Sequence, residues 1–286
     1  MTRERAYLAV DIGGTKMLSG VVSLDGRVLV QDRCDTPTAG AWDALAALVR
    51  RVQSMAEPYD LIGCGVGCGG PMSDQGDKVS NLHITEWQDF PLRSSLAELT
   101  GLTTYVDNDA KAIVLGEVWC GAAVGHRNVI GMVVSTGVGG GIICDGRLLD
   151  GHTGNAGHIG HVNVVPNGRV CKCGSMGCLE AVASGTAIAA MTGRPAIEAT
   201  PTIIRQTGTY VGRAVASVAA LLDLRLAVIG GSVALGFGAE FYAAAQAEVD
   251  RYARIRFVRG VDVRPAGLGA DAPLIGAAAV ARRHLN

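Results

Sequence analysis

The chain has 286 residues, of which 49% are hydrophobic and 18% charged, so it can bury one large or two ordinary hydrophobic cores. Its formal net charge of −1 and its lack of long basic runs exclude a protein that coats nucleic acid through charge. No stretch resembles a signal peptide or a membrane span, and the eight cysteines lack the spacing of a disulfide framework. We therefore expect a cytoplasmic protein.

Strand and helix patterns alternate along the chain, which predicts an α/β protein. Two Asp-Gly pairs, Asp25-Gly26 and Asp145-Gly146, are typical of hairpin turns. Alanine-rich sequence typical of helices fills most of the last third of the chain. The predicted strands span residues 7–10, 17–23, 61–68, 103–106, 129–134, 142–144 and 226–229, and the predicted helices span 41–55, 90–99 and 110–119.

One segment of the first hairpin recurs later in the chain. Gly20–Arg27 reads GVVSLDGR and Gly140–Arg147 reads GGIICDGR, and each copy follows a loop rich in glycine and threonine. This repeat predicts two related halves that each begin with a β-hairpin. Coincidence among small residues is the alternative explanation.

Glycine-rich loops between strands are candidate phosphate-binding sites, because glycine lets backbone N–H groups approach an anion. The first loop, Asp11–Lys16, reads DIGGTK and lacks the spacing of a Walker loop, and a tight hairpin explains it equally well. The second, Ser135–Gly141, repeats the pattern, and a third follows a predicted strand. The candidate nucleotide-binding residues are Asp11, Gly13, Gly14, Thr15, Lys16, Thr136, Gly137, Gly139, Gly140, Gly230 and Gly231.

Asp107, Asn108 and Asp109 lie between a predicted strand and a predicted helix. A carboxylate beside an amide at such a position can orient a hydroxyl group and accept its proton. Capping of the helix N-terminus is the alternative, and the spacing alone favours it. Further along the same helix, Lys111 and Glu117 are predicted to be exposed.

Three cysteines and a histidine have the spacing of a zinc site: His161, Cys171, Cys173 and Cys178. One imidazole and three thiolates form a closed tetrahedral ligand set, whereas a redox motif would be C-x-x-C beside a βαβ unit. With four protein ligands no coordination position stays open. The sequence therefore predicts a structural Zn²⁺ that stabilises a loop without a hydrophobic core.

Together these motifs resemble the ROK family of bacterial sugar kinases and repressors, within the sugar kinase/actin/Hsp70 superfamily. The most specific part is Gly157-x-x-Gly-His161 followed by Cys171-x-Cys-Gly-x-x-Gly-Cys178-x-Glu180. The resemblance implies two ribonuclease-H-like (actin-like ATPase) α/β domains with an interdomain cleft and a zinc-bound loop. The expected small domain spans 1–112 plus 274–286, and the expected large domain spans 113–273 with its zinc loop at 154–180.

The resemblance also implies a reaction: transfer of the γ-phosphate of ATP, bound with Mg²⁺, to the 6-hydroxyl of a hexose. Glucose is the expected acceptor, Asp109 the catalytic base, and the protein a homodimer or homotetramer. The glycine loops would bind the phosphates, and Gly70 would lie in a loop over the sugar. The implied sugar-binding residues are Gly70, Asn108, Asp109, His158, His161 and Glu180.

Two positions depart from the family pattern. His158 replaces a glutamate that accepts hydrogen bonds from two sugar hydroxyls, and Lys111 replaces a usual asparagine. Bacterial N-acetylmannosamine kinases share the Gly-His-x-Gly-His pattern, so an N-acylhexosamine is an alternative acceptor. An unusual amino sugar, a cyclitol, and a catalytically silent sugar sensor are further alternatives. A repressor would need a winged helix before Asp11, so no nucleic-acid partner is expected.

The 40 glycines are numerous for a chain of this length. Many of them lie in the stretches just described, including the five from Gly63 to Gly70. We interpret this enrichment as a repeated need for close backbone approach to phosphate, sugar and metal.

Overall fold

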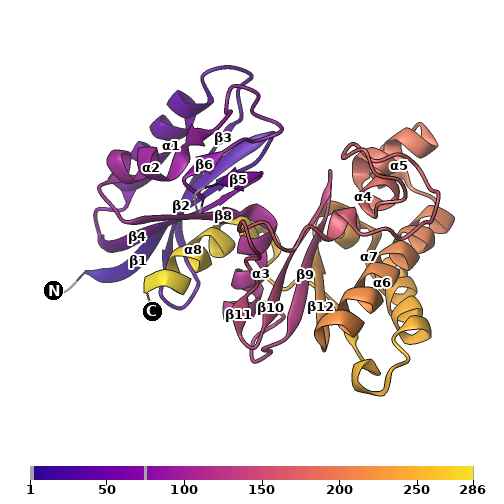
Figure 1. Ribbon diagram of the computed structural model, residues 1–286. Coiled ribbons are helices and arrows are strands. Elements are labelled where there is room, and N and C mark those ends of the chain that lie inside the picture. The colour runs from indigo at the N-terminus through magenta and orange to yellow at the C-terminus, as the bar shows by residue number, and fades with distance from the viewer. Residues whose placement is uncertain (1–2, 74–75, 286) are drawn as a thin grey trace. The chain divides into compact units, whose positions relative to one another are not determined.

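The computed structural model describes residues 3–73 and 76–285, and it divides into two compact units (Figure 1). Within the described residues, unit 1 contains the chain up to Gly121, Asp150–Ala156 and the chain from Leu268. Unit 2 contains Ala122–Leu149 and Gly157–Gly267. Each unit is built around one mixed five-stranded sheet, which confirms the predicted α/β class.

The sheet of unit 1 has the strand order β3-β2-β1-β4-β8. Strands β1, β2 and β3 pair antiparallel, whereas β4 and β8 continue the sheet parallel to β1. The carboxyl ends of β1, β4 and β8 therefore meet at one edge, where Asp11 pairs with Gly67 and Gly67 with Asp107. The strands are β1 (Glu4–Ile12), β2 (Lys16–Ser23), β3 (Val28–Asp35), β4 (Tyr59–Cys68) and β8 (Thr104–Asn108). A small second sheet, which the sequence did not predict, contains β5 (Met72–Ser73), β6 (Lys78–Val79) and β7 (Phe90–Pro91).

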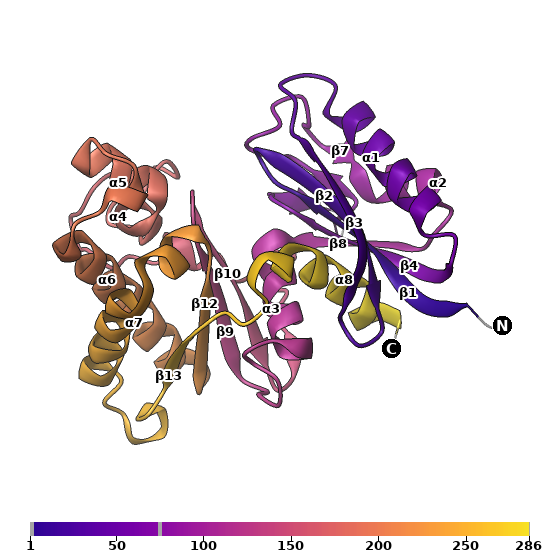
Figure 2. The ribbon, with the colours of Figure 1, turned by 180° about the vertical axis from the view of Figure 1, so that it is seen from behind.

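Helices cover both faces of this sheet (Figure 2). They are α1 (Ala41–Met55) and α2 (Leu92–Thr100) on one face, and α3 (Asp109–Cys120) and α8 (Ala272–Leu285) on the other. Side chains alternate along β1, so Leu8 and Val10 join the core under α1 while Tyr7 and Ala9 pack with α8. The same alternation directs Asp11 toward the face covered by α8 and α3.

Two glycines of β4 allow α8 to pack closely on the sheet. A Cβ at Gly65 would lie 1.9 Å from the carbonyl oxygen of Ala277, and one at Gly63 would lie 2.5 Å from Leu285 Cδ1. Contact with the α8 backbone requires glycine at position 65, whereas at position 63 the neighbouring atom is the end of a flexible side chain. Both glycines contact α8, not a ligand. The interpretation of the glycine enrichment given above is wrong for both.

The sheet of unit 2 has the order β11-β10-β9-β12-β13, with the same sequence of antiparallel and parallel pairs as unit 1. The two copies of the repeat lie at equivalent places in β2 and β10, so the predicted relation between the halves is confirmed. The strands are β9 (Val129–Val134), β10 (Val138–Cys144), β11 (Arg147–Leu148), β12 (Leu226–Gly230) and β13 (Asp262–Pro265).

The long helices of unit 2 build its hydrophobic core against the sheet. Helix α6 begins with Thr200 as N-cap and proline in the first turn, and it packs on α7 through Gly208 and Gly212. The α-helices are α4 (Glu180–Ala183), α5 (Gly185–Thr192), α6 (Pro201–Leu222) and α7 (Ser232–Tyr252). The 3₁₀ helices that lie wholly within the described residues are η2 (Ile159–His161), η3 (Ala196–Glu198), η4 (Arg256–Val258) and η5 (Gly269–Asp271).

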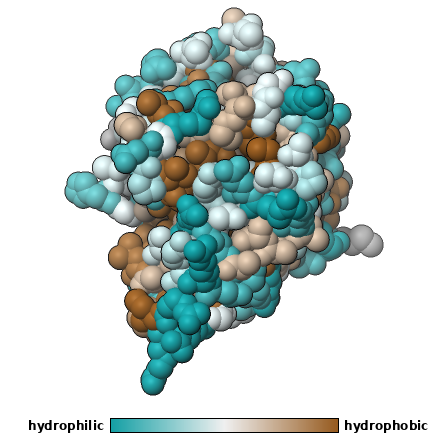
Figure 3. Space-filling model, turned by 90° about the vertical axis from the view of Figure 1, so that its right-hand side faces the viewer, coloured by the Kyte–Doolittle hydropathy of each residue, from teal (hydrophilic) through white to brown (hydrophobic). Residues whose placement is uncertain are grey.

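None of the helices in the described part of the chain is long and apolar enough to cross a membrane. On the face shown in Figure 3, hydrophobic residues are interspersed with hydrophilic ones.

Candidate functional site

Two acidic residues lie close together at the carboxyl edge of the unit 1 sheet. A Cβ on Gly67 would be 3.4 Å from Asp11 Oδ1 and 3.5 Å from Asp109 Cα, so these residues flank Gly67. Burial and the neighbouring negative charge of Asp109 raise the pKa of Asp11 to about 7, and Lys16 partly opposes this shift. The edge thus holds two interacting carboxyl groups, as in many catalytic sites.

Asn108 is the N-cap of α3. Its Oδ1 accepts hydrogen bonds from the backbone N–H groups of Ala110, at 3.0 Å, and of Lys111, at 3.4 Å. The capping alternative is therefore confirmed for Asn108. Because the cap uses the amide oxygen, the amide nitrogen is the group that Asn108 can offer to a hydroxyl.

The loop after β1 is a tight hairpin with exposed polar residues at its tip. The N–H of Gly13 donates to the carbonyl of Lys16 at 3.0 Å, and Thr36 Oγ1 donates to the carbonyl of Gly13 at 2.8 Å. A Cβ on Gly14 would lie 2.7 Å from His83 Cβ, so contact with His83 also requires glycine there. Thr15 and Lys16 are exposed, as residues that contact a phosphate must be in the free protein.

Gly70 lies in a turn that a buried asparagine holds in place. The Gly70-Pro71 peptide bond is cis, and Asn81 Nδ2 donates to the carbonyl of Gly69 at 3.1 Å. Asn81 Oδ1 also accepts from the N–H of His83 at 2.8 Å. Neither Asn81 nor His83 was predicted from the sequence, because no local spacing relates them to the glycine loops.

Two of the predicted nucleotide loops meet within unit 2. Ser135 Oγ and Ser232 Oγ are 2.9 Å apart, which joins the loop after β9 to the first residue of α7. Gly231, with φ +93, precedes this helix, and a Cβ there would lie 2.4 Å from the carbonyl oxygen of Val134. A helix N-terminus beside backbone N–H groups favours phosphate. The arrangement therefore suits Thr136, Gly137, Gly139, Gly230 and Gly231 as phosphate neighbours.

Glu180 and the segment before His161 pack against β10. Glu180 Oε2 accepts a hydrogen bond from the N–H of Val138 at 3.0 Å. A Cβ on Gly160 would lie 2.2 Å from the Val138 carbonyl oxygen, and one on Gly140 would lie 2.9 Å from Ile159 Cγ2. Gly140 is thus required for contact within the protein as well as being a predicted phosphate neighbour.

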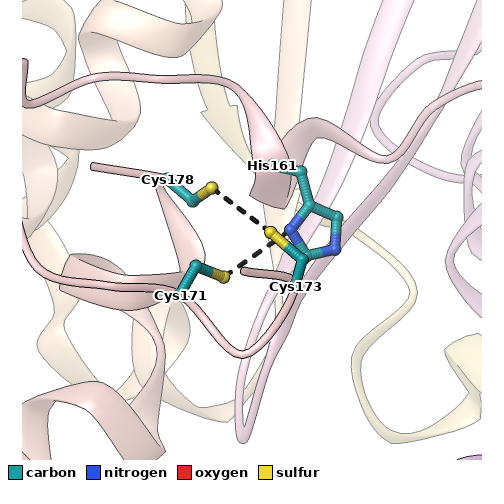
Figure 4. A group of neighbouring side chains, drawn as sticks. All are labelled: His161, Cys171, Cys173 and Cys178. Atoms are coloured by element: carbon teal, nitrogen blue, oxygen red, sulfur yellow. Dashed lines mark hydrogen bonds between the residues drawn. The ribbon is translucent and has the colours of Figure 1, made fainter. Parts of the chain in front are cut away.

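The predicted zinc ligands form one cluster (Figure 4). The potential ligand atoms of His161, Cys171, Cys173 and Cys178 all lie within 4.8 Å of one another. His161 Nδ1 is 3.8 Å from Cys171 Sγ, and the Sγ atoms of Cys173 and Cys178 are 3.7 Å apart. A tetrahedron with Zn–S bonds of about 2.3 Å has edges of roughly 3.8 Å, so the cluster fits a zinc ion. The His158 ring lies nearly parallel to that of His161, with their centroids 6.2 Å apart.

Lys111 and Glu117 are buried, contrary to the prediction from the sequence: they are 1% and 2% exposed. Helix α3 packs tightly against α8, where a Cβ on Gly116 would lie 3.1 Å from the backbone nitrogen of Gly276, and none of its residues is exposed. Lys111 Nζ contacts Asp107 Oδ1 at 2.8 Å, and Glu117 Oε1 accepts from the N–H of Leu268 at 3.1 Å. The four-residue spacing of Asp107 and Lys111 was the one local signal of this contact.

Two units with equivalent mixed sheets and a His–Cys₃ cluster define the class of actin-like α/β proteins with a zinc site. The profile of the ROK family matches residues 7–284. The chain is 32% identical to a glucokinase from Halalkalibacterium halodurans over 99% of this chain and 97% of that protein. It is 36% identical to an N-acetylmannosamine kinase from Escherichia fergusonii over 96% of this chain and 98% of that protein.

A solved structure shares this fold over nearly the whole chain. The ROK family glucokinase from Streptomyces griseus, in complex with glucose and AMPPNP, superposes with a TM-score of 0.83 at 32% identity. The match covers 97% of this chain and 99% of that one. The chain therefore belongs to the ROK family, and its resemblance to ROK sugar kinases is confirmed.

The His–Cys₃ cluster predicts about one zinc per chain in the purified protein. Cys178→Ser removes a buried ligand, so the bound zinc should be lost and the free energy of unfolding should fall by about 4 kcal/mol. Elemental analysis and chemical denaturation measure the two effects. Cys64→Ser, at a buried cysteine outside the cluster, should keep the metal. Wild-type protein with well under one zinc per chain would contradict the assignment.

The raised pKa of Asp11 predicts a pH-dependent stability. Between the ordinary value of 3.8 and about 7, the folded chain keeps a proton on Asp11 that the unfolded chain has lost. Stability due to this group therefore falls as pH rises through this window, by at most about 1.4 kcal/mol per pH unit. Chemical denaturation of wild type and of Asp11→Asn, both without nucleotide and from pH 5 to 8, measures the effect as the difference between their free energies of unfolding.

The control for this measurement is Asp32→Asn. A hydrogen bond from Arg51 lowers the pKa of Asp32, so both its folded and unfolded forms are ionised above pH 5. The free energy of unfolding of Asp32→Asn should therefore differ from that of wild type by a constant amount over the same pH range. If the free energy of unfolding of Asp11→Asn also differs from that of wild type by a constant amount, the pKa of Asp11 is not raised.

Proposed function

We propose that the chain is an ATP-dependent kinase that transfers the γ-phosphate to the 6-hydroxyl of a hexose, with glucose as the first candidate acceptor. The observation that carries this proposal is the position of Asp109 beside Asp11 at the carboxyl ends of parallel strands. Ligands of open α/β sheets bind at such strand ends. A carboxylate there can accept the proton of an attacking hydroxyl.

The resemblance to ROK sugar kinases supports the roles of the other residues that would bind the sugar and the nucleotide. Asn108 would donate from its amide nitrogen to sugar hydroxyls, and Gly70 would contribute backbone groups. From unit 2, Glu180, His158 and the second ring nitrogen of His161 would contact the sugar. The nucleotide phosphates would bind the loops that contain Asp11, Gly13, Gly14, Thr15, Lys16, Thr136, Gly137, Gly139, Gly140, Gly230 and Gly231.

Phosphoryl transfer passes through a loose transition state, so the protein contributes mainly by positioning groups and balancing charge. Mg²⁺ bound with ATP would neutralise charge on the phosphate oxygens. Asp109 would accept the proton of the 6-hydroxyl, and backbone N–H groups of the glycine loops would stabilise the departing diphosphate. Zn²⁺ would have a structural role, since His161, Cys171, Cys173 and Cys178 fill its four positions.

His158 favours a second candidate acceptor, an N-acylhexosamine such as N-acetylmannosamine. An imidazole nitrogen gives or accepts one hydrogen bond, whereas a carboxylate accepts from two hydroxyls. Relatives at 32% and 36% identity carry both names, so overall similarity does not separate the two. The test panel also includes kanosamine, for an unusual amino sugar; turnover on no sugar would favour a sensor. We propose a homodimer or homotetramer, which light scattering during size-exclusion chromatography measures.

Asp109→Asn should reduce turnover by about 10³-fold while sugar binding persists, because the amide cannot accept the hydroxyl proton. A coupled ADP-release assay measures turnover, and calorimetry measures sugar binding. Asp60→Asn changes an exposed carboxylate at the opposite end of β4 and should leave both unchanged. Near-normal turnover of Asp109→Asn would remove Asp109 from the role of base.

His158→Glu should raise the ratio of kcat/KM for glucose to that for N-acetylmannosamine by about tenfold, the effect of roughly 1.4 kcal/mol from one additional hydroxyl contact. The assay covers glucose, mannose, N-acetylglucosamine, N-acetylmannosamine and kanosamine. His126→Glu, outside the proposed site, should leave the ratio unchanged. If His158→Glu keeps its zinc and its ratio equals that of wild type, His158 does not determine the acceptor.

A further inference from the structure

Lys111 is a fully buried lysine on the first turn of α3, two residues after Asp109. Its ammonium group contacts three acceptors: Asp107 Oδ1 at 2.8 Å, Asp150 Oδ1 at 3.1 Å and the carbonyl oxygen of Gly154 at 2.9 Å. An ammonium has three N–H donors, so these contacts match its full capacity. Lysine is rarely buried unless it is paired in this way.

Arg283 of α8 completes a group of two cations and two carboxylates. It forms a bidentate contact with Asp150, at 3.2 and 2.5 Å, and its Nη1 is 3.6 Å from Asp107 Oδ2. Burial alone would raise the pKa of Asp150, but hydrogen bonds from Arg283 and Lys111 outweigh it and hold the pKa below its ordinary value. The formal charges of the four side chains cancel.

On one side, this group of charged side chains contacts the turn that carries Asn108 and Asp109. Asp107 Oδ1 accepts from Lys111 Nζ and also from the backbone N–H of Asn108, at 2.8 Å. The backbone N–H of Lys111 in turn donates to Asn108 Oδ1. Lys111 therefore contacts the turn through both its side chain and its backbone.

On its other side, the group of charged side chains contacts the segment Asp150–Ala156. Lys111 holds this segment at Asp150 and Gly154, and Asn155 Nδ2 donates to the carbonyl oxygen of Met72 at 3.3 Å. Met72 directly follows the Gly70-Pro71 turn. The segment thus connects, within unit 1, the turn at Asn108 with the loop that carries Gly70.

We propose that Lys111 is a positioning residue for the acceptor sugar. Its ammonium fixes Asp107 and the segment Asp150–Ala156 together, and thereby sets the orientation of Asn108 and Asp109 toward the sugar hydroxyls. This inference rests on the proposed function, in which Asn108 and Asp109 contact the sugar.

Lys111→Met keeps an unbranched side chain of similar length and removes its charge and its N–H donors. We expect kcat to fall by about 10²-fold, the usual consequence of misplacing reacting groups by about 1 Å. The KM for the sugar should rise about tenfold, equivalent to roughly 1.4 kcal/mol, while the KM for ATP changes less than about twofold. Steady-state kinetics on the acceptor found for wild type measure all three quantities.

The matched control is Arg213→Met, which breaks a partly buried ion pair with Glu248 in unit 2, where Arg213 Nε is 2.6 Å from Glu248 Oε1. It should lower stability without changing the kinetic constants. If Lys111→Met behaves like this control, Lys111 is only structural and the proposal is overturned.

Asp150→Asn is the second variant, since it keeps Lys111 paired with Asp107 and Gly154 and changes a side chain that is 44% exposed. It should raise the sugar KM about threefold, equivalent to roughly 0.6 kcal/mol. If Lys111→Met does not fold, an unchanged sugar KM in Asp150→Asn overturns the proposal. Absence of wild-type turnover on every sugar overturns the proposed function and this inference together, whereas wild-type turnover with unaffected variants overturns only the inference.

Discussion

Repulsion between the carboxylates at the carboxyl edge of the sheet is the main constraint on the structure of unit 1. The parallel strands β1, β4 and β8 bring Asp11, Asp107 and Asp109 to one edge of the sheet. Like charges so close together cannot all ionise without compensation. Two of them are compensated in different ways: the pKa of Asp11 is raised, while Asp107 is paired with Lys111 and Arg283. Charge balance at this edge therefore involves α3, α8 and the segment Asp150–Ala156.

The two units share one strand arrangement and use it differently. In unit 1 the hairpin of β2 and β3 is long, whereas in unit 2 β11 is only two residues and a glycine-rich segment follows it. This segment packs against β10 at Gly140 and Val138, and the His–Cys₃ cluster holds it further on. The His–Cys₃ cluster, a candidate zinc site, thus joins parts of a segment that contributes few side chains to the hydrophobic core.

Features that depend on nearby residues could be predicted from the sequence. The hairpins follow from strand patterns and Asp-Gly turns, the zinc ligands from their spacing, and the repeat from eight aligned residues. The burial of Lys111 could not be predicted, because Asp150 and Arg283 lie far from it in the chain. Gly63 and Gly65 were misinterpreted for the same reason, since α8, the element that packs against them, comes from the other end of the sequence.

The position of α8 has a consequence for the order in which the chain matures during synthesis. Tyr7 and Ala9 pack against Leu274, Ala277 and Ala278, so one face of the first sheet lacks its cover until the ribosome has made these residues. Unit 2, by contrast, contains no residue beyond Gly267. Since domains fold as units during translation, the second half of the repeat can mature first. The N-terminal sheet, although synthesised first, therefore keeps an apolar face uncovered until α8 has been made.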